Sequence, residues 1–379
     1  MTSPAASVLI VDYEDLQNDP KGKDNPILGI LAEAFGKDGS GILAVRNCPG
    51  FVEAKSKLLP MAHDLINLPA DYLESKLTDP GSLYNAGWSL GKEKLGDGEP
   101  DFAKGSFYYN PCTDKPGSEL DRKTYPLSYP CNIWPDDKLP ALEPAAKELG
   151  LLLKNVTVDL ARHLDVYLQA TVGTAYTPNT LYHAMKDTEK VKGRLLYYYP
   201  KKMEDENNGT GEGKKKKLSD SWIGWHNDSG FLTALAGDIY LDHTTGKLLE
   251  ACPDDQAGLY VADREDNIRR VVIPSDCLAI QMGECTQILS GGAVCATPHW
   301  VRAAERKDVA RISLAAFVDT PPDFQLVVPS GSTKDSVCHS DQQSKRVPPL
   351  DQRWTEDGMT FGDFLTKTFQ MYYDWTAPS

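Results

Sequence analysis

The segment His226-Asn227-Asp228 places an imidazole and a carboxylate two residues apart. In an extended strand the side chains of residues i and i+2 point to the same side, so both groups can reach one ion. A second histidine, His299, follows a short β-rich run that we interpret as a strand ending at that residue. Two histidines and one carboxylate would form a facial triad that suits Fe(II) and leaves open positions for oxygen chemistry. A chance surface His–Asp pair is the alternative interpretation.

A second pair of residues, Arg311 and Ser313, opens the next apolar run after His299. The planar guanidinium offers a fork of donors that matches a carboxylate. The serine hydroxyl, two residues on, can donate from the same side of a strand. We therefore predict a carboxylate clamp that would bind a chelating co-substrate next to the metal.

The elements that must position these side chains are short strands that follow one another with turn residues between them. Such spacing is typical of a sandwich or jelly roll. The predicted strands of this region are 194–199, 231–235, 258–262, 270–273, 277–282, 293–297 and 311–318. The chain before them reads as mixed α/β, with strands at 7–12 and 41–45 and helices at 27–35, 52–68 and 142–168. Helical spacing returns at 358–375, and we expect the long helix 142–168 to back a sheet.

These patterns predict a mainly β fold with flanking helices around a jelly-roll core. We divide the chain into an N-terminal α/β region at 1–190, a core at 191–320 and a C-terminal extension with a helix at 321–379. Within the core, residues 201–221 are rich in glycine, asparagine and lysine, which indicates a flexible polar insertion.

The composition argues against nucleic-acid and membrane partners. The 379 residues carry a formal net charge of -14, whereas binding to phosphate backbones depends on clustered positive charge. No apolar run approaches the roughly 18 residues that a membrane-spanning helix needs. The eight cysteines form no C-x-x-C pair, which favours reduced thiols over a zinc knuckle or a disulfide framework. We predict a cytoplasmic monomer that acts on a small molecule.

Several motifs, in order along the chain, resemble the isopenicillin N synthase-like, 2-oxoglutarate/Fe(II)-dependent oxygenases. Residues 195–200 resemble the family's Asn-Tyr-Tyr-Pro strand, and residues 226–233 resemble its His-Thr-Asp block. Residues 283–292 stand where the family has Gly-Asp, an apolar stretch and Ser-Asn-Gly, and residues 298–301 resemble its distal His-Arg-Val. Residues 86–92, 106–111 and 361–365 resemble isopenicillin N synthase itself.

The resemblance implies a double-stranded β-helix with an N-terminal region of the non-haem dioxygenase type. It also implies Fe(II) and 2-oxoglutarate, with ascorbate as a candidate reductant. The implied reaction is oxidation of a small molecule with O2, most often hydroxylation, with release of succinate and CO2; desaturation and ring closure are further outcomes of such chemistry. The implied metal ligands are His226, Asp228 and His299, and the implied 2-oxoglutarate contacts are Arg311, Ser313 and Tyr199.

The chain departs from the family pattern at three positions. Tyr197 replaces the family's asparagine, and Trp300 replaces the arginine after the distal histidine. Asn85 stands where isopenicillin N synthase has an arginine that holds a substrate carboxylate, so we do not expect that peptide substrate. Core packing is the more common role of aromatic side chains. Our candidates for the substrate pocket are Asn85, Trp88, Phe107, Tyr109 and Trp225.

Two alternatives stay open from the sequence. An isopenicillin N synthase-like Fe(II) oxidase carries the same Arg-x-Ser pair without using 2-oxoglutarate, and succinate formation would distinguish the two. A catalytically silent binding protein could retain the same fold, and an iron-binding titration would decide that question.

Overall fold

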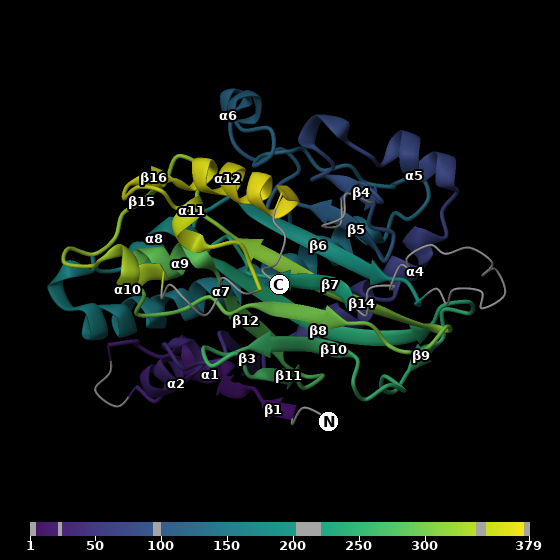
Figure 1. The fold of residues 1–379 in the computed structure, drawn as a ribbon. Coiled ribbons are helices and arrows are strands. Elements are labelled where there is room, and N and C mark those ends of the chain that lie inside the picture. Colours follow the sequence, from purple (N-terminus) through teal and green to yellow (C-terminus); the bar gives the residue numbers. More distant parts are fainter. Residues whose placement is uncertain (1–4, 22–24, 94–99, 202–220, 339–345, 375–379) are drawn as a thin grey trace, which may run out of the picture.

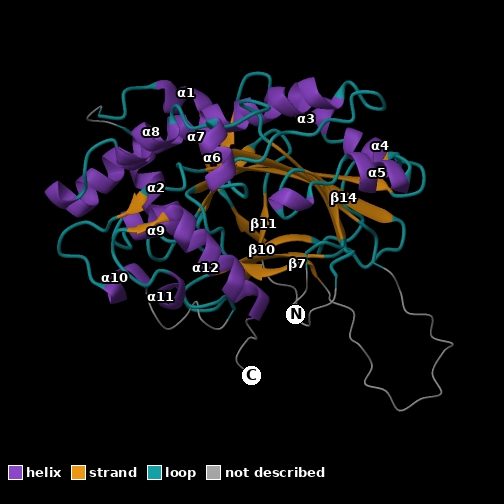
Figure 2. Cartoon of the chain, turned by 90° about the horizontal axis from the view of Figure 1, so that it is seen from above, coloured by secondary structure: helices purple, strands orange, loops and turns teal. Residues whose placement is uncertain are grey.

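The structure is a computed structural model that describes residues 5–21, 25–93, 100–201, 221–338 and 346–374 (Figure 1). Nearly all of the predicted polar insertion at 201–221 therefore lies outside the described residues. Two β-sheets face each other, and helices cover the outer face of the larger sheet. Figure 2 shows α3, α7 and α8 along one side of the strands, with β7, β10 and β11 toward the other side.

Among the described residues the larger sheet has nine strands, and apart from the parallel pair β2 and β3 its neighbours are antiparallel. It contains strands from both the N-terminal region and the core, so the outer strands extend the core sheet. In order across the sheet these are β2 (Leu9–Asp12), β3 (Ile42–Arg46), β12 (Leu278–Met282), β8 (Leu232–Asp242), β14 (Val309–Val318), β6 (Val191–Tyr198), β5 (Lys104–Tyr109) and β4 (Gly87–Leu90), with β9 (Leu248–Leu249) beside β8.

The smaller sheet has five strands in the part of the chain that the structure describes, and it carries the predicted histidines. Its order is β1 (Ala5–Ser7), β11 (Ile268–Val272), β10 (Gly258–Ala262), β13 (His299–Arg302) and β7 (Ser221–His226). A short pair, β15 (Gln325–Leu326) and β16 (Met359–Thr360), lies apart from both sheets. The two facing sheets with helices on one side confirm the predicted jelly-roll class.

Strand β6 is apolar on both faces because both of its faces are covered by another layer. Leu195 and Tyr197 belong to the core between the larger sheet and the helices, whereas Leu196 and Tyr198 belong to the core between the two sheets. Side chains alternate with a period of two, and here each face meets another layer. The strand therefore reads as a continuous apolar run, without the alternation of a half-exposed strand.

The long helix α7 (Leu142–Val172) packs across the larger sheet, as the sequence predicts. Its buried residues recur every three to four positions and form the stripe that faces the strands. The other helices are α1 (Tyr13–Gln17), α2 (Ile27–Phe35), α3 (Phe51–Leu58), α4 (Met61–Ile66), α5 (Ala70–Lys76), α6 (Glu119–Thr124), α8 (Thr180–Met185), α9 (Glu284–Leu289), α10 (Lys334–Cys338), α11 (Leu350–Arg353) and α12 (Phe361–Asp374). The single helix predicted at 52–68 is wrong, because the chain breaks into α3 and α4 at Pro60.

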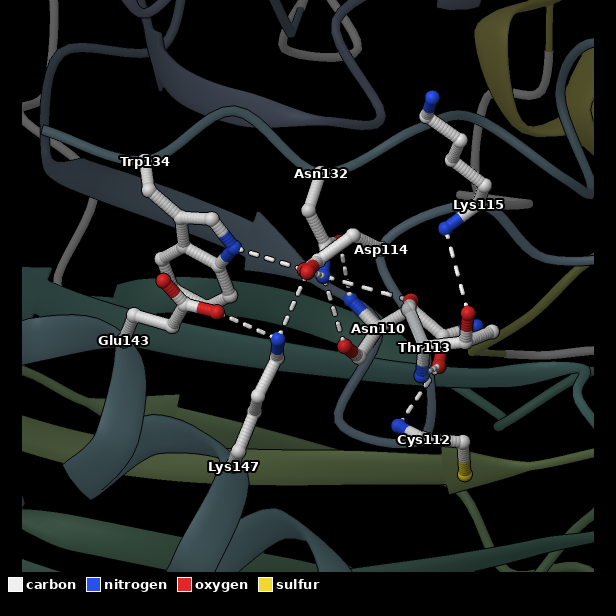
Figure 3. Close-up of polar contacts among 9 residues, drawn as sticks. All are labelled: Asn110, Cys112, Thr113, Asp114, Lys115, Asn132, Trp134, Glu143 and Lys147. Carbon is white, nitrogen blue, oxygen red and sulfur yellow. Dashed lines mark hydrogen bonds and ion pairs between the residues drawn. The ribbon is translucent and has the colours of Figure 1, made fainter. Parts of the chain in front are cut away.

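A polar network ties the loop after β5 to α7 (Figure 3). The Asp114 carboxylate accepts hydrogen bonds from the side chains of Asn132, Trp134 and Lys147, each at 2.8 Å. Lys147 also donates to Glu143 at 2.5 Å, one turn earlier in α7. This network fixes the outer strands β4 and β5, which carry several of the predicted pocket residues.

All eight cysteines are unpaired thiols. No helix among the described residues combines the length and apolar character that crossing a bilayer requires.

Candidate metal and co-substrate site

The three predicted metal ligands lie together between the two sheets. His226 and His299 are directly opposite each other on the paired strands β7 and β13, and their ring centroids are 4.1 Å apart. Nε2 of His299 is 3.8 Å from Oδ1 of Asp228. One ligand atom from each residue lies within 4.8 Å of the others. The three side chains can therefore hold a single ion.

Strand pairing, and not a loop, positions both histidines. The predicted strand at 293–297 is wrong, since residues 295–298 form a loop and β13 begins at His299. Pro298 has no N–H for a ladder, and the Cys295 N–H donates to the Phe35 carbonyl at 2.9 Å. His299 therefore opens a strand, while His226 closes one, and the two ends meet at the same edge.

A close approach of the backbone turns the chain after Asp228. A Cβ on Gly230 would lie 2.1 Å from Oδ1 of Asp319, so only glycine fits without a shift. The same carboxylate oxygen accepts the Phe231 N–H at 3.0 Å. This contact starts β8 immediately after the ligand loop and brings Asp228 back toward the histidines.

The hydrogen bonds of both imidazoles leave Nε2 available to a metal. Nδ1 of His226 lies 2.9 Å from the Gly224 carbonyl oxygen, and Nδ1 of His299 lies 3.1 Å from that of Thr297. A carbonyl oxygen only accepts, so Nδ1 carries the proton in each ring. Such a backbone contact also fixes the ring orientation of a metal-binding histidine.

Burial shifts the three ligands toward their uncharged forms. It lowers the pKa of His299 to about 4, and burial with the nearby His299 also lowers the pKa of His226. Burial raises the pKa of Asp228, whose Oδ2 has no hydrogen-bond partner among the described residues. A neutral imidazole is the form that binds metals, and a cation would satisfy the unpaired carboxylate oxygen. The donor set therefore fits a divalent metal.

The predicted carboxylate clamp lies in the same cavity, whose volume is about 200 Å³. The Arg311 side chain is buried, and its Nη2 donates to Oδ1 of Asp238 at 2.5 Å. Its Nε and Nη1 are buried without a partner among the described residues. The guanidinium lies over the Tyr198 ring at 4.6 Å, and Ser313 lines the cavity beside it. Unsatisfied buried donors on a cation favour an anionic ligand here.

Comparison with known proteins shows likeness in structure alone. No known family model matches the chain, and no curated protein sequence does. A full-length protein of Neurospora crassa, solved in complex with alpha-KG, has a TM-score of 0.64 at 17% identity, with 95% of both chains covered. A putative 2OG-Fe(II) oxygenase family protein of Caulobacter crescentus has a TM-score of 0.64 at 17% identity, covering 97% of this chain and 99% of that one.

The chain has the fold of the 2OG-Fe(II) oxygenases. A third neighbour, the 2-oxoglutarate complex of AtDAO1 (dioxygenase for auxin oxidation 1) of Arabidopsis thaliana, has a TM-score of 0.54 at 19% identity. The alignment covers 86% of this chain and 98% of that one. This likeness confirms the fold that the sequence resemblance predicts.

Within this oxygenase fold, Tyr199 does not join the predicted clamp. It packs in the helix-facing core, with its ring centroid 5.1 Å from that of Tyr197 and 5.8 Å from that of His243. Tyr198, one position earlier on the strand, points to the opposite face and lines the cavity. The phenolic hydroxyl groups at this end of the cavity thus belong to Tyr198 and, on β8, Tyr240.

None of the five predicted pocket residues is part of the cavity wall. Trp88, Phe107 and Tyr109 are buried in the core between the larger sheet and the helices. Trp225 stacks outside the cavity, with its ring centroid 5.6 Å from that of Trp300. The side-chain oxygen of Asn85 accepts a hydrogen bond from Lys192. The apolar wall of the cavity is instead formed by Leu196, Ile223, Leu235, Val301 and Phe317.

Four residues that the sequence analysis missed support the metal loop of the oxygenase fold, and we call them the metal-loop clamp: Asn227, Glu284, Arg353 and Tyr372. Asn227, between the two ligands of the loop, donates from its side chain to Glu284 at 2.9 Å and from its backbone to the Tyr372 hydroxyl at 3.1 Å. Arg353 donates two hydrogen bonds to the Glu284 carboxylate, at 2.5 and 2.6 Å, and both side chains are fully buried. The Glu284 N–H donates to the Asp228 carbonyl at 2.8 Å. The C-terminal helices α11 and α12 therefore hold the loop that carries Asp228.

Proposed function

We propose that this chain is a 2-oxoglutarate- and Fe(II)-dependent oxygenase that oxidises a small organic molecule with O2. The observation that carries the proposal is the convergence of His226, Asp228 and His299 in one cavity with Arg311, a buried cation whose donors are only partly used. The fold likeness to the Neurospora crassa protein, which was solved with alpha-KG bound, supports it.

The proposed roles follow from the donors that each residue offers. His226 and His299 would bind Fe(II) through Nε2, and Asp228 would bind through its carboxylate. Arg311 and Ser313 would bind the distal carboxylate of 2-oxoglutarate. When bound, Fe(II) supplies the activation of O2 that is coupled to oxidation of 2-oxoglutarate to succinate and CO2. In a hydroxylation, one oxygen atom of O2 would go into succinate and the other into the product.

The protein prepares this chemistry by positioning groups and excluding water. Asp238 holds one end of the Arg311 guanidinium, so the remaining donors keep a fixed direction. The Leu196, Leu235 and Phe317 side chains make the cavity apolar around the ligands, which strengthens every charge interaction inside it.

Succinate formation is the direct test. Purified protein is stripped of metal, loaded with Fe(II) and supplied with 2-oxoglutarate, ascorbate, O2 and a small-molecule extract, and succinate is measured by mass spectrometry. We expect succinate in the wild type and none in His226→Ala, whereas His183→Ala on helix α8 is the matched control and should equal wild type. Wild-type protein that binds Fe(II) but neither binds 2-oxoglutarate nor makes succinate would contradict the proposal.

A second candidate is an Fe(II) oxidase of the isopenicillin N synthase type, which does not use 2-oxoglutarate. The ion pair between Arg311 and Asp238 favours it, because that pair already balances the buried charge without a co-substrate. Consumption of O2 without succinate would identify this activity. A silent binding protein on the same fold would bind no iron in a titration, and the converging ligand atoms argue against it.

The proposal extends to the setting of the enzyme. We propose a cytoplasmic monomer, since eight unpaired thiols suit a reducing compartment. Light scattering coupled to size-exclusion chromatography would give the oligomeric state, and a mass near twice 41.7 kDa would contradict the monomer.

A further inference from the structure

Three cationic side chains lie in a row on and just before β6, and the row begins at one end of the cavity. Lys190, Lys192 and Arg194 are spaced by two residues, so they point to the same face of the sheet. Arg194 lines the cavity. On the neighbouring strand β14, Arg194 is paired with Ala315 and Lys192 with Phe317, and both of these partners also line the cavity. Lys192 and Lys190 are not part of the cavity wall, but they continue the row beyond Arg194 on the same face of the sheet.

The two flanking cations are each paired with a carboxylate, but the central one is not. The Lys190 ammonium lies 3.7 Å from Asp319, and the Arg194 guanidinium lies 2.5 Å from Glu93. Lys192 donates at 2.8 Å to the side-chain oxygen of Asn85, a neutral amide, and forms no ion pair within the part of the chain that the structure describes. Lys192 is thus a partly buried cation whose nearby carboxylates, Asp319 and Glu93, are each paired with another cation.

The environment of Lys192 disfavours its charged form and would favour binding of an anion. Burial, together with the charge of Lys190, lowers the pKa of Lys192 to about 7. The Tyr108 ring holds both neighbouring cations in place, with its centroid 5.9 Å from the Lys192 ammonium and 5.1 Å from the Arg194 guanidinium. An anion bound at this point would stabilise the ammonium form of Lys192 and offset the desolvation that burial imposes.

We propose that Lys192 and Asn85, which lie just beyond Arg194 at the end of the cavity, bind a carboxylate group of the organic substrate, so that the enzyme acts on carboxylic acids. This inference rests on the proposed oxygenase function and names its substrate class. A carboxylate carries the single charge that one unpaired ammonium can balance, whereas a phosphate would bring nearly two.

The position of Lys192 suits a substrate that reaches the metal ligands. Across the sheet, Lys192 pairs with Phe317 and Phe317 pairs with Thr233, so the outer two positions are about 10 Å apart. The Thr233 hydroxyl is within hydrogen-bonding reach of the Asp228 carboxyl. Phe317 forms the apolar floor between Lys192 and Thr233. An acid anchored at Lys192 would lay its carbon chain over Phe317 toward the metal triad.

The proposed substrate site is distinct from the site for 2-oxoglutarate. Along β14, Arg311 is six residues from Phe317, which corresponds to about 20 Å. A five-carbon dicarboxylate cannot span that distance. The two anions would therefore bind at separate ends of the cavity.

Paired ligands that differ only in charge test the proposal. The protein is loaded with Mn(II), saturated with 2-oxoglutarate without O2, and titrated by calorimetry with hexanoate or phenylacetate and with the matched amides, hexanamide and phenylacetamide. We expect at least one acid to bind wild type about tenfold more tightly than its amide, as for a charge-assisted hydrogen bond. Lys192→Met should remove this preference, and Lys123→Met on the exposed surface of α6 should keep it.

The comparison of acid and amide in the wild type requires no variant, and Asn85→Leu provides a second, milder perturbation that should weaken the preference. The proposal would be overturned if neither acid bound the wild type more tightly than its amide. It would also be overturned if Lys192→Met kept the full preference for the acid. Failure of the oxygenase proposal is read separately, as absence of 2-oxoglutarate binding to the Mn(II)-loaded wild type; the acid titrations are then run without it.

Discussion

Replacing Arg353 with methionine would test the metal-loop clamp. Arg353 and Glu284 are both fully buried and share two hydrogen bonds, so removal of the guanidinium leaves a buried carboxylate without its counter-charge. Breaking a buried pair in this way costs about 3–5 kcal/mol. The entropy of unfolding is about 2.1 cal/mol/K per residue, or about 0.8 kcal/mol/K for the 379 residues. We therefore expect Arg353→Met to lower Tm by about 4–6 °C.

Calorimetric melting of the metal-free protein measures this shift, and Mn(II) titration measures its effect on the site. Without Arg353 the Glu284 side chain is no longer held in place, so Asn227 loses a fixed hydrogen-bond acceptor. We therefore expect metal affinity to fall about 10- to 100-fold, as for other groups that orient metal ligands. Arg306→Met is the matched control, since Arg306 pairs with Asp308 in solvent and its removal should leave Tm and metal affinity close to those of wild type. The double variant Arg353→Met/Glu284→Leu should recover most of the loss. Equal losses in the two single arginine variants, or no recovery in the double variant, would refute this account of the clamp.

Three further outcomes are expected. His226→Ala or Asp228→Ala should each abolish stoichiometric Mn(II) binding in calorimetry while far-ultraviolet circular dichroism stays native, and retained binding in both would contradict the ligand assignment. Arg311→Met should raise the Kd for 2-oxoglutarate about 10- to 150-fold, the value of a charge-assisted hydrogen bond, and an unchanged Kd would favour the oxidase without 2-oxoglutarate. The affinity for the carboxylic acids should fall as pH rises from about 6.5 to about 8.5, because Lys192 loses its proton with a pKa of about 7. Lys192→Met should show no such fall. A wild-type affinity that does not change with pH would count against Lys192 as the anchor. The charged groups that face Lys192 are Lys190, Arg194, Asp319 and Glu93.

The convergence of the three candidate metal ligands was predictable because metal-binding chemistry leaves a local pattern in the sequence. The two-residue spacing of His226 and Asp228 is meaningful for any extended segment, and His299 follows a short β-rich run. The helix predicted at 27–35 matches α2, for the same reason: its apolar spacing is local. Elements of this kind depend on residues that are close in sequence, so their pattern can be recognised in a single sequence.

The face of a strand that reads as apolar on both sides could not be predicted. Leu195 to Tyr199 offers no polar residue to mark the solvent side, and a shift of one position exchanges the two faces. The motif therefore pointed to Tyr199 where Tyr198 lines the cavity. Phe107 and Tyr109 were misplaced by the same ambiguity, since they occupy the helix-facing side of β5.

The residues that matter through long-range contacts left no local signal. Glu284 and Arg353 are separated by 69 positions, and each alone reads as an ordinary charged residue. Lys192 and Arg194 alternate with smaller residues, which in sequence resembles a solvated edge strand. Only the packing of β6 against its neighbours reveals that Arg194 lines a cavity and that Lys192 lies next to it on the same face.

The pairing of His226 with His299 across a backbone ladder bears on which metal a preparation will contain. Because hydrogen bonds between strands set the spacing of the imidazoles, the pocket exists before any ion arrives. A ready-made set of two nitrogens and one oxygen accepts most first-row divalent ions, with copper and zinc ahead of iron in affinity. Protein taken from an expression host would then carry whatever ion the host supplied in excess. An inactive preparation would indicate the wrong bound metal before it indicated a lack of catalytic ability.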